Sequence, residues 1–184
     1  MNSAPATGDR IELRLPGGAV SIALLVDSAP QTCAYFSELI SSGGLEDCHV
    51  FRILTDSNEE ADDLCPIRIV QFDPHNAMDA PRHAVPHEDT RETLLTHRKW
   101  TVSAARFELG QLYGSFFVCM RDEPELDWGG SRQADRQGFA AFGEVVSGFD
   151  ALESVFEDAE TQQMLTRQIP VSDVCLRTHQ ANEG

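Results

Sequence analysis

Residues 10–24 read RIELRLPGGAVSIAL, and this stretch decides the class of fold. Its apolar residues occupy every second position on both sides of a central Pro16-Gly17-Gly18 turn. Alternation with a period of two is typical of a strand that buries one face. Two such runs joined by a glycine-containing turn indicate a hairpin. The chain is therefore expected to begin as antiparallel sheet.

Short strand-like segments recur along the rest of the chain, separated by polar connections. They are expected at residues 48–54, 67–72, 100–105, 115–120, 139–146 and 171–177. Only two helices are expected, at residues 30–42 and 149–158. Many short strands with few helices indicate a mainly β fold. A closed barrel is the favoured arrangement of these strands, because closure removes exposed sheet edges. We expect a closed eight-stranded antiparallel barrel capped by two α-helices.

The length of 184 residues is that of one domain. No internal repeat or break divides the sequence, so a single domain is expected over residues 10–177. Residues 1–9 and 178–184 are expected to be flexible. Two polar segments, residues 55–65 and 127–137, are expected to be solvated loops.

The charge balance disfavours two classes of partner. Thirty acidic side chains against fourteen basic ones give a formal net charge of −16, which repels both nucleic acid and anionic membranes. No apolar stretch approaches the roughly 20 residues that span a bilayer. The first ten residues do not resemble a secretory signal. We therefore expect a cytoplasmic monomer.

Seven short motifs, in the order in which they occur, resemble the cyclophilins, a family of barrel-shaped peptidyl-prolyl cis-trans isomerases. The motifs are Ala29-Pro30-Gln31-Thr32 with Phe36, Val50-Phe51-Arg52-Ile53, Ile69-Val70-Gln71, Thr101 to Arg106, Ser115-Phe116-Phe117-Val118, Leu126-Asp127, and Phe142 to Val146 with Gly148. The stretch from Glu125 to Gly143 is similar to a divergent bacterial branch with a longer loop. The resemblance implies an enzyme that acts on proline-containing peptides or unfolded proteins.

Catalysis of this isomerisation calls for a hydrogen-bond donor near the prolyl nitrogen. Rotation about an amide bond faces a barrier of about 18–20 kcal/mol, and no covalent bond is broken. A donor in a desolvated apolar pocket binds the twisted amide better than the planar one. Arg52 lies between apolar neighbours on an expected strand, and its guanidinium is a rigid, permanently charged donor. Its local pattern also fits a surface arginine paired with a carboxylate, but the resemblance assigns it the catalytic role.

The resemblance implies the remaining site residues as well. Gln71 would hydrogen-bond the substrate backbone, and Phe117 would form the floor of the proline pocket. Phe116 and Phe117 are adjacent in a strand, so only one of them can face the site. The other substrate-binding positions implied are Phe51, Ile69, Ala105, Arg106, Ser115, Leu126 and Phe139. This chemistry needs neither a metal nor a cofactor.

Several positions depart from the family pattern. Ser115 stands where the family has a glutamine, Phe139 where the eukaryotic pattern has a histidine, and Phe72-Asp73 where it has Gly-Gly. Glu125 stands where a tryptophan is associated with cyclosporin binding. We therefore expect weaker catalysis than in a typical member and low affinity for cyclosporin.

Two other functions are compatible with the same barrel. A catalytically weak or inactive protein could bind proline-containing segments as a chaperone-like or scaffold module. The barrel could also be reused on a small molecule. Retention of Arg52, Gln71 and Phe117 favours the isomerase.

Two other kinds of chemistry find little support in the sequence. The densest group of potential metal ligands is His75, His83 and His87 with nearby carboxylates, and its spacing matches no zinc motif. Ser103 and Ser115 lack the Gly-x-Ser-x-Gly turn of α/β-hydrolases. Neither a metal site nor a serine hydrolase is predicted.

Overall fold

A single antiparallel sheet organises the protein. The computed structural model describes residues 8–58, 60, 65–74 and 81–178. In chain order the strands and helices are β1 (Arg10–Leu15), β2 (Gly18–Leu24), α1 (Pro30–Ser41), β3 (His49–Leu54), β4 (Ile69–Asp73), β5 (His83–Ala84), α2 (Thr90–Thr93), β6 (Thr101–Arg106), β7 (Gln111–Cys119), the 3-10 turn η2 (Pro124–Leu126), β8 (Ala140–Ser147), α3 (Phe149–Glu157), β9 (Met164–Pro170) and β10 (Val174–Arg177).

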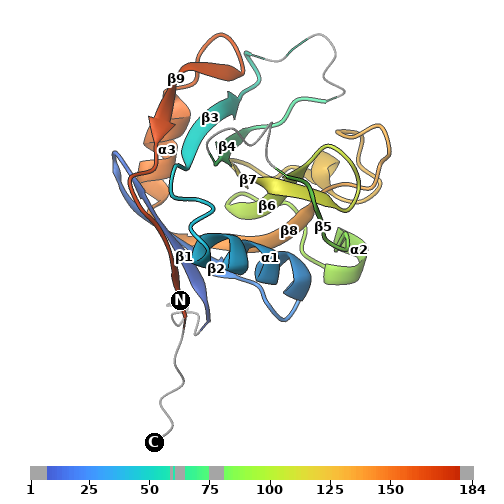
Figure 1. Ribbon diagram of the computed structural model, residues 1–184. Helices are drawn as coiled ribbons and strands as arrows, with labels where there is room; N and C mark the ends of the chain where they lie inside the picture. The colour runs from blue at the N-terminus through green and yellow to red at the C-terminus, as the bar shows by residue number, and fades with distance from the viewer. Residues whose placement is uncertain (1–7, 59, 61–64, 75–80, 179–184) are drawn as a thin grey trace, which may run out of the picture.

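The strands follow the order β10-β1-β2-β8-β6-β7-β4-β3-β9, and β5 pairs with β7. Figure 1 shows this sheet curled around a common interior. The mainly β class is confirmed, but the prediction of a closed barrel with eight strands and two helices is wrong in detail. The described residues contain ten strands and three α-helices, and β9 and β10 end the path without pairing with each other. The sequence pattern missed β5, which has two residues, and β9, which is mostly exposed and therefore shows no apolar alternation.

The two longer helices lie where the sequence predicts them. Helix α1 packs on β8 and β10, and α3 packs on β2 and β4. Helix α1 begins with a proline and has no side-chain cap from its own N-cap residue, Ala29. The carboxylate of Glu88 takes that place: it accepts hydrogen bonds from the backbone N–H groups of Gln31 and Thr32 and from the Thr32 hydroxyl. A distant loop therefore holds the start of α1.

Aromatic rings fill the interior of the curled sheet. Phe36 of α1 stacks on Phe142 of β8 with ring centroids 4.3 Å apart and meets Phe116 of β7 edge-on at 5.8 Å. Phe116 in turn stacks on Phe72 of β4 at 4.9 Å. All four side chains are fully buried. Burial of this much apolar area is the main force that holds α1 against the sheet.

A second, smaller hydrophobic cluster lies on the opposite face of β4, β6 and β7. It contains Phe117, whereas the neighbouring Phe116 belongs to the interior cluster. The prediction that these two rings point to opposite faces is confirmed, because side chains alternate along a strand. This outer cluster is the base on which the site is built.

The segment at residues 55–65 was predicted to be a solvated loop. Among its described residues Asp56, Ser57 and Glu60 are exposed, and Asn58 departs from the prediction. Asn58 is buried, and its side-chain amide both donates and accepts hydrogen bonds. Its amide nitrogen donates to the carbonyl oxygens of Ile53 at 2.9 Å and Glu160 at 3.1 Å, and its amide oxygen accepts from Thr55 N–H at 2.8 Å. Residues 59 and 61–64 lie outside the described part of the chain. Asn58 therefore ties this segment to the chain that leads into β9.

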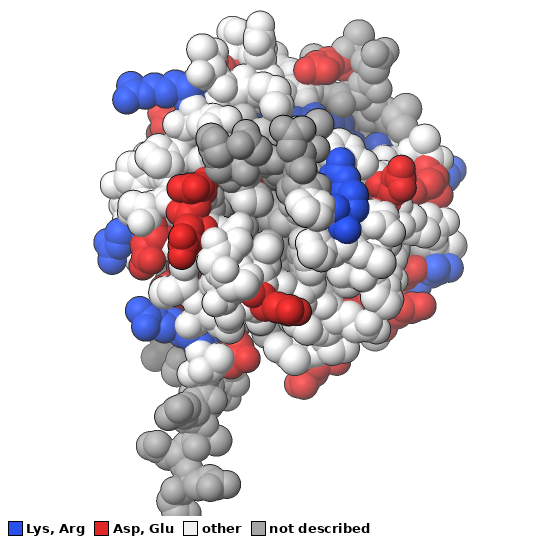
Figure 2. Space-filling model, viewed as in Figure 1, with Lys and Arg blue, Asp and Glu red and all other residues white. Residues whose placement is uncertain are grey.

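Charged side chains are spread over the surface. Figure 2 shows acidic and basic groups distributed across the visible face rather than gathered into one patch. Within the described residues, no helix is both long enough and apolar enough to cross a membrane.

Candidate active site

A cavity of about 140 Å³ opens over the outer cluster. Its walls come from β3, β4, β6, β7, η2 and the segment that follows η2. Eight of the ten residues predicted for the site line it, namely Arg52, Ile69, Gln71, Ala105, Arg106, Phe117, Leu126 and Phe139. Residues more than 80 positions apart in the chain therefore meet in one concave pocket that joins an apolar floor to arginine and glutamine side chains.

Three of these residues form a row across adjacent strands. In the antiparallel register Arg52 of β3 pairs with Gln71 of β4, and Gln71 pairs with Phe117 of β7. Directly paired residues in antiparallel strands present their side chains on the same face of the sheet. The row therefore places a cation, an amide and an aromatic ring side by side along the cavity.

The aromatic floor is rigidly supported. Phe117 meets Phe139 edge-on with ring centroids 5.4 Å apart, and it stacks on the far side against the ring of His97 at 6.2 Å. Nδ1 of His97 lies 2.7 Å from a carboxylate oxygen of Asp127, and its Nε2 lies 2.9 Å from the Ser103 hydroxyl.

This arrangement links Ser103 to a histidine and a carboxylate, a connection that the sequence did not indicate. Ser103 is fully buried, however, so no substrate can reach its hydroxyl. The hydrogen bonds hold the His97 ring parallel to Phe117. We interpret the three residues as a support for the pocket floor rather than as a nucleophilic triad.

Arg52 is held in a defined orientation. A register shift between Val50 and Arg52 interrupts the pairing of β3 with both β4 and β9. The Nε–H of Arg52 donates to the side-chain oxygen of Gln163 at 3.1 Å, and an Nη2 hydrogen bond goes to the same oxygen. The guanidinium is therefore bonded to a neutral amide at the edge of the cavity.

Ser115 lies behind the cavity rather than in its wall. Its buried hydroxyl donates to the carbonyl oxygen of Phe72 at 2.7 Å and accepts from the Gln71 amide nitrogen at 3.1 Å. The expectation that Ser115 contacts substrate directly does not agree with this position. Its side chain is too short to reach the pocket and instead orients Gln71.

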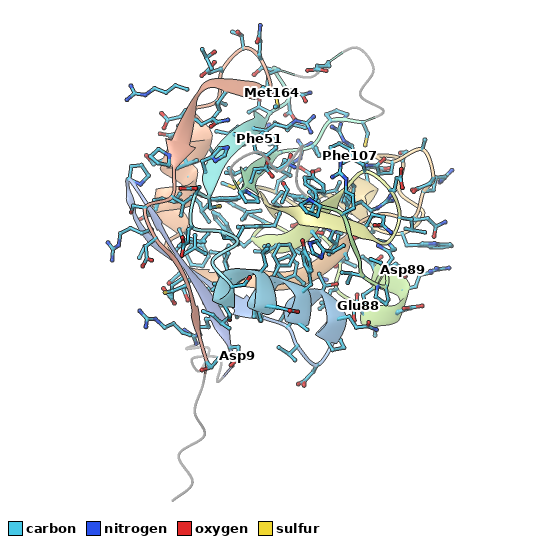
Figure 3. The ribbon with its side chains drawn as sticks, in the orientation of Figure 1. Asp9, Phe51, Glu88, Asp89, Phe107 and Met164 are labelled. Atoms are coloured by element: carbon cyan, nitrogen blue, oxygen red, sulfur yellow. The ribbon has the colours of Figure 1, made fainter. Side chains whose placement is uncertain are left out.

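Phe51 does not line the cavity either. It lies on β3 next to Arg52 (Figure 3), at the register shift between Val50 and Arg52 that interrupts simple alternation, and its half-buried ring meets His49 edge-on at 6.4 Å. Its assignment as a substrate-binding residue is therefore not supported by its position.

Arg106 binds the protein itself. Its side chain is 1% exposed and forms a double salt bridge with Asp135, with both N–O distances 2.8 Å. Its Nε–H donates to the carbonyl oxygen of Gly138 at 2.8 Å. The Arg106 guanidinium holds the pKa of Asp135 below its usual range. The segment 127–137, which was predicted to be a solvated loop, is thus fastened to β6.

Asp135→Ala should release this segment. The substitution leaves the buried guanidinium of Arg106 without its carboxylate, which should destabilise the protein by about 2 kcal/mol. Hydrogen exchange followed by mass spectrometry should show faster exchange at residues 128–138 and unchanged exchange in β8. Equal protection of residues 128–138 in variant and wild type would show that the salt bridge does not hold the segment.

Five further residues also line the cavity but were not predicted from the sequence: Ile67, Phe107, Tyr113, Arg132 and Gln133. A signal existed for Tyr113, because it lies four residues before Phe117 on β7 and so shares its face. Phe107 is half exposed and stacks on Tyr113 at 4.9 Å, and the guanidinium of Arg82 lies over both rings. Arg132 and Gln133 belong to the fastened segment and carried no signal in the sequence.

Asp73 is a buried carboxyl beside this network. It is 6% exposed, and its Oδ1 atom has no hydrogen-bond partner among the described residues. Burial raises the pKa of Asp73 to about 7, against a smaller opposing contribution from the Ser115 hydroxyl. A folded-state pKa above the unfolded value of about 3.9 means that its stabilising contribution is complete below pH 4. That contribution is lost as the pH rises through 7.

Asp73→Asn should therefore change how stability depends on pH. Between pH 4 and pH 8 the wild type should lose about 4 kcal/mol of unfolding free energy relative to the variant, because Asn stays neutral. Urea denaturation at both pH values measures this difference. The exposed Asp27→Asn is the control for removing one negative charge. A difference between Asp73→Asn and wild type that is the same at both pH values would contradict the assignment.

The predicted polar histidine segment shows no metal centre in its described part. His83 packs against Tyr35, and Nε2 of His87 lies 2.9 Å from the Gln137 carbonyl oxygen. His75 and Asp79 lie outside the described residues. Among those that are described, no group of three His, Cys, Asp or Glu residues is placed to hold a metal ion.

Comparison with solved structures identifies the fold. A cyclophilin-type peptidyl-prolyl cis-trans isomerase from Cryptosporidium parvum superposes with a TM-score of 0.70 at 16% identity, covering 93% of this chain and 98% of that one. A second crystal structure of that protein, obtained in the presence of the dipeptide Ala-Pro, gives a TM-score of 0.68 at 16% identity over 94% and 99% of the chains. The fold is therefore that of a cyclophilin.

The sequence itself supplies the family. The family model described as cyclophilin type peptidyl-prolyl cis-trans isomerase/CLD matches residues 10–178. The chain belongs to this family, as its seven motifs predict. No curated protein matches the sequence.

Proposed function

We propose that this protein catalyses the cis–trans isomerisation of Xaa-Pro bonds in peptides and unfolded proteins, with Arg52 stabilising the twisted amide. Membership of the isomerase family supports the reaction. The observation that carries the residue assignment is the row of Arg52, Gln71 and Phe117 along one cavity. The row puts a donor, a backbone-binding amide and a ring-binding floor next to each other.

The proposed chemistry follows from how amide resonance is lost. When the Xaa-Pro bond twists, the prolyl nitrogen becomes pyramidal and its lone pair localises. A guanidinium N–H beside that nitrogen then makes a stronger hydrogen bond than it makes to the planar amide, so it lowers the barrier. Phe117, Leu126 and Phe139 would shield this hydrogen bond from solvent once the proline ring is bound, and the bond would then be worth more than it is in water.

The other cavity residues would bind and orient the peptide. Phe117, with Leu126 and Phe139 beside it, would receive the proline ring. Gln71, oriented by Ser115, would hydrogen-bond the peptide backbone. The backbone of Ala105 and Arg106 would receive the residue before proline, since the Arg106 guanidinium is already bonded within the protein. The Cryptosporidium protein was crystallised with Ala-Pro, which supports a proline-containing peptide as the substrate class.

Exchange spectroscopy on an Ala-Pro tetrapeptide tests the reaction. Uncatalysed exchange takes tens to hundreds of seconds at 25 °C, so catalysis appears as exchange cross-peaks between cis and trans resonances. We expect these cross-peaks at substoichiometric protein. Their absence at equimolar protein would exclude an isomerase.

A binding module is the second candidate. The replacement of the family's glutamine and Gly-Gly pair by Ser115 and Phe72-Asp73 favours it, because these changes remove polar reach and backbone freedom near the pocket. The same titration separates the two functions: peptide resonances that shift without faster exchange indicate binding alone.

A further inference from the structure

Arg52 is fixed by a residue from the opposite end of the chain. Gln163 immediately precedes β9 and is 111 positions from Arg52. Its side-chain oxygen accepts both an Nε–H and an Nη2–H of the guanidinium. Its own backbone carbonyl accepts from the N–H of Ile53 at 2.9 Å. One residue thus bonds to two consecutive residues of β3.

We propose that Gln163 is a positioning residue for Arg52, which sets the direction of the guanidinium toward the prolyl nitrogen. The inference rests on the proposed function. An arginine side chain has four rotatable bonds and loses about 2 kcal/mol of conformational entropy when it is ordered. If Gln163 orders it in advance, that cost is removed from the step that reaches the transition state.

Gln163 is itself held rigidly enough for this role. It is 1% exposed. The chain leading into it is tied down by Asn58, whose amide nitrogen donates to the carbonyl oxygens of Glu160 and Gln162. The same amide nitrogen donates to Ile53, next to Arg52. Asn58 and Gln163 therefore fix the same two segments to each other, and the Arg52 side chain lies at that junction.

The Gln163 oxygen that accepts from Arg52 carries no formal charge. A carboxylate at this position would orient Arg52 equally well but would offset its positive charge, and this chain has thirty acidic residues that could have served. An amide oxygen fixes direction while the formal charge stays on the guanidinium. The contact with Gln163 itself therefore takes nothing from the charge that acts on the localising lone pair of the substrate nitrogen.

Gln163→Met tests the proposal, because methionine keeps the length and volume of the side chain and removes the amide oxygen. We expect kcat/KM for the Ala-Pro tetrapeptide to fall about tenfold, with KM changed less than about threefold. In the NMR spectrum, exchange of the Arg52 Nε–H with water should accelerate by about tenfold or more. The exposed Gln162→Met is the matched control and should leave both quantities unchanged.

A double-mutant cycle separates positioning from a general structural effect. In the Arg52→Ala background, Gln163→Met should lower kcat/KM by less than about twofold, since the residue that it orients is gone. A full further loss of about tenfold in that background would overturn the proposal. So would a Gln163→Met variant with wild-type activity.

Gln163→Glu provides the rescue. It retains an oxygen acceptor and should keep the slow Arg52 Nε–H exchange, with a kcat/KM between wild type and Gln163→Met. Fast Nε–H exchange in Gln163→Glu would overturn the positioning role even if Gln163→Met failed to fold. The exchange of the Arg52 Nε–H with water can be measured without any catalytic turnover. A wild-type protein that does not isomerise the peptide would therefore refute the proposed isomerase activity alone. Fast exchange of the Nε–H with water in the wild type would instead refute the proposed orientation of Arg52 by Gln163.

Discussion

Arg52→Ala should lower kcat/KM for an Xaa-Pro peptide by about 100-fold or more, because it removes the only donor proposed to act on the prolyl nitrogen. Peptide affinity should change less than about threefold, since the proline ring is bound by Phe117 and its neighbours rather than by the guanidinium. Exchange spectroscopy gives the rate, and titration followed by peptide chemical shifts gives the affinity.

Two variants sharpen this result. Arg68→Ala removes the same charge from an exposed arginine that pairs with Asp56 outside the cavity, so its activity should equal that of wild type. Arg52→Lys keeps the charge but loses the planar fork that bonds Gln163, so it should recover little activity. If the Arg52→Ala variant interconverts the cis and trans forms of the peptide as fast as the wild type does, the donor has been assigned to the wrong residue.

Glu88→Ala should produce the largest loss of stability, about 3–4 kcal/mol. The substitution removes the acceptor for two backbone N–H groups and one hydroxyl at the start of α1, all of them buried or partly buried. The N-terminal N–H groups of a helix have no partner within the helix, and Ala29 offers none. Figure 3 shows Glu88 beside the start of α1. The carboxylate also faces the positive end of the helix dipole.

Urea denaturation at pH 7 measures this loss, and the thermal midpoint should fall by roughly 10 °C. The exposed Glu92→Ala is the matched control and should change stability by less than about 0.5 kcal/mol. Glu88→Gln retains one oxygen acceptor and should fall between the two. A Glu88→Ala variant as stable as Glu92→Ala would show that α1 does not depend on the distant carboxylate.

Much of the fold can be predicted from the sequence because its signals are local. The hairpin at residues 10–24 and the helix after Pro30 follow from periodicity and turn residues. The opposite directions of Phe116 and Phe117 follow from strand alternation alone. The resemblance to the cyclophilins then supplies the identity of the site, since its motifs occur in the family's order.

The supports of the site could not be predicted in this way. Gln163, Asp135 and Glu88 each act on a residue between 29 and 111 positions away, and none of them belongs to a periodic pattern. Strand β9 was missed for a related reason. Most of its side chains are exposed, so pairing with β3, rather than burial, makes it a strand.

The two faces of β7 separate the effects of substitutions. Odd-numbered residues such as Tyr113 and Phe117 belong to the cluster under the cavity, and even-numbered ones such as Phe116 and Val118 belong to the interior. The residues that stabilise the fold and those that would contact substrate therefore occupy interleaved positions of one strand. A substitution at Ser115, on the odd-numbered set, would change the pocket through Gln71 and leave the interior packing of Phe116 and Val118 in place.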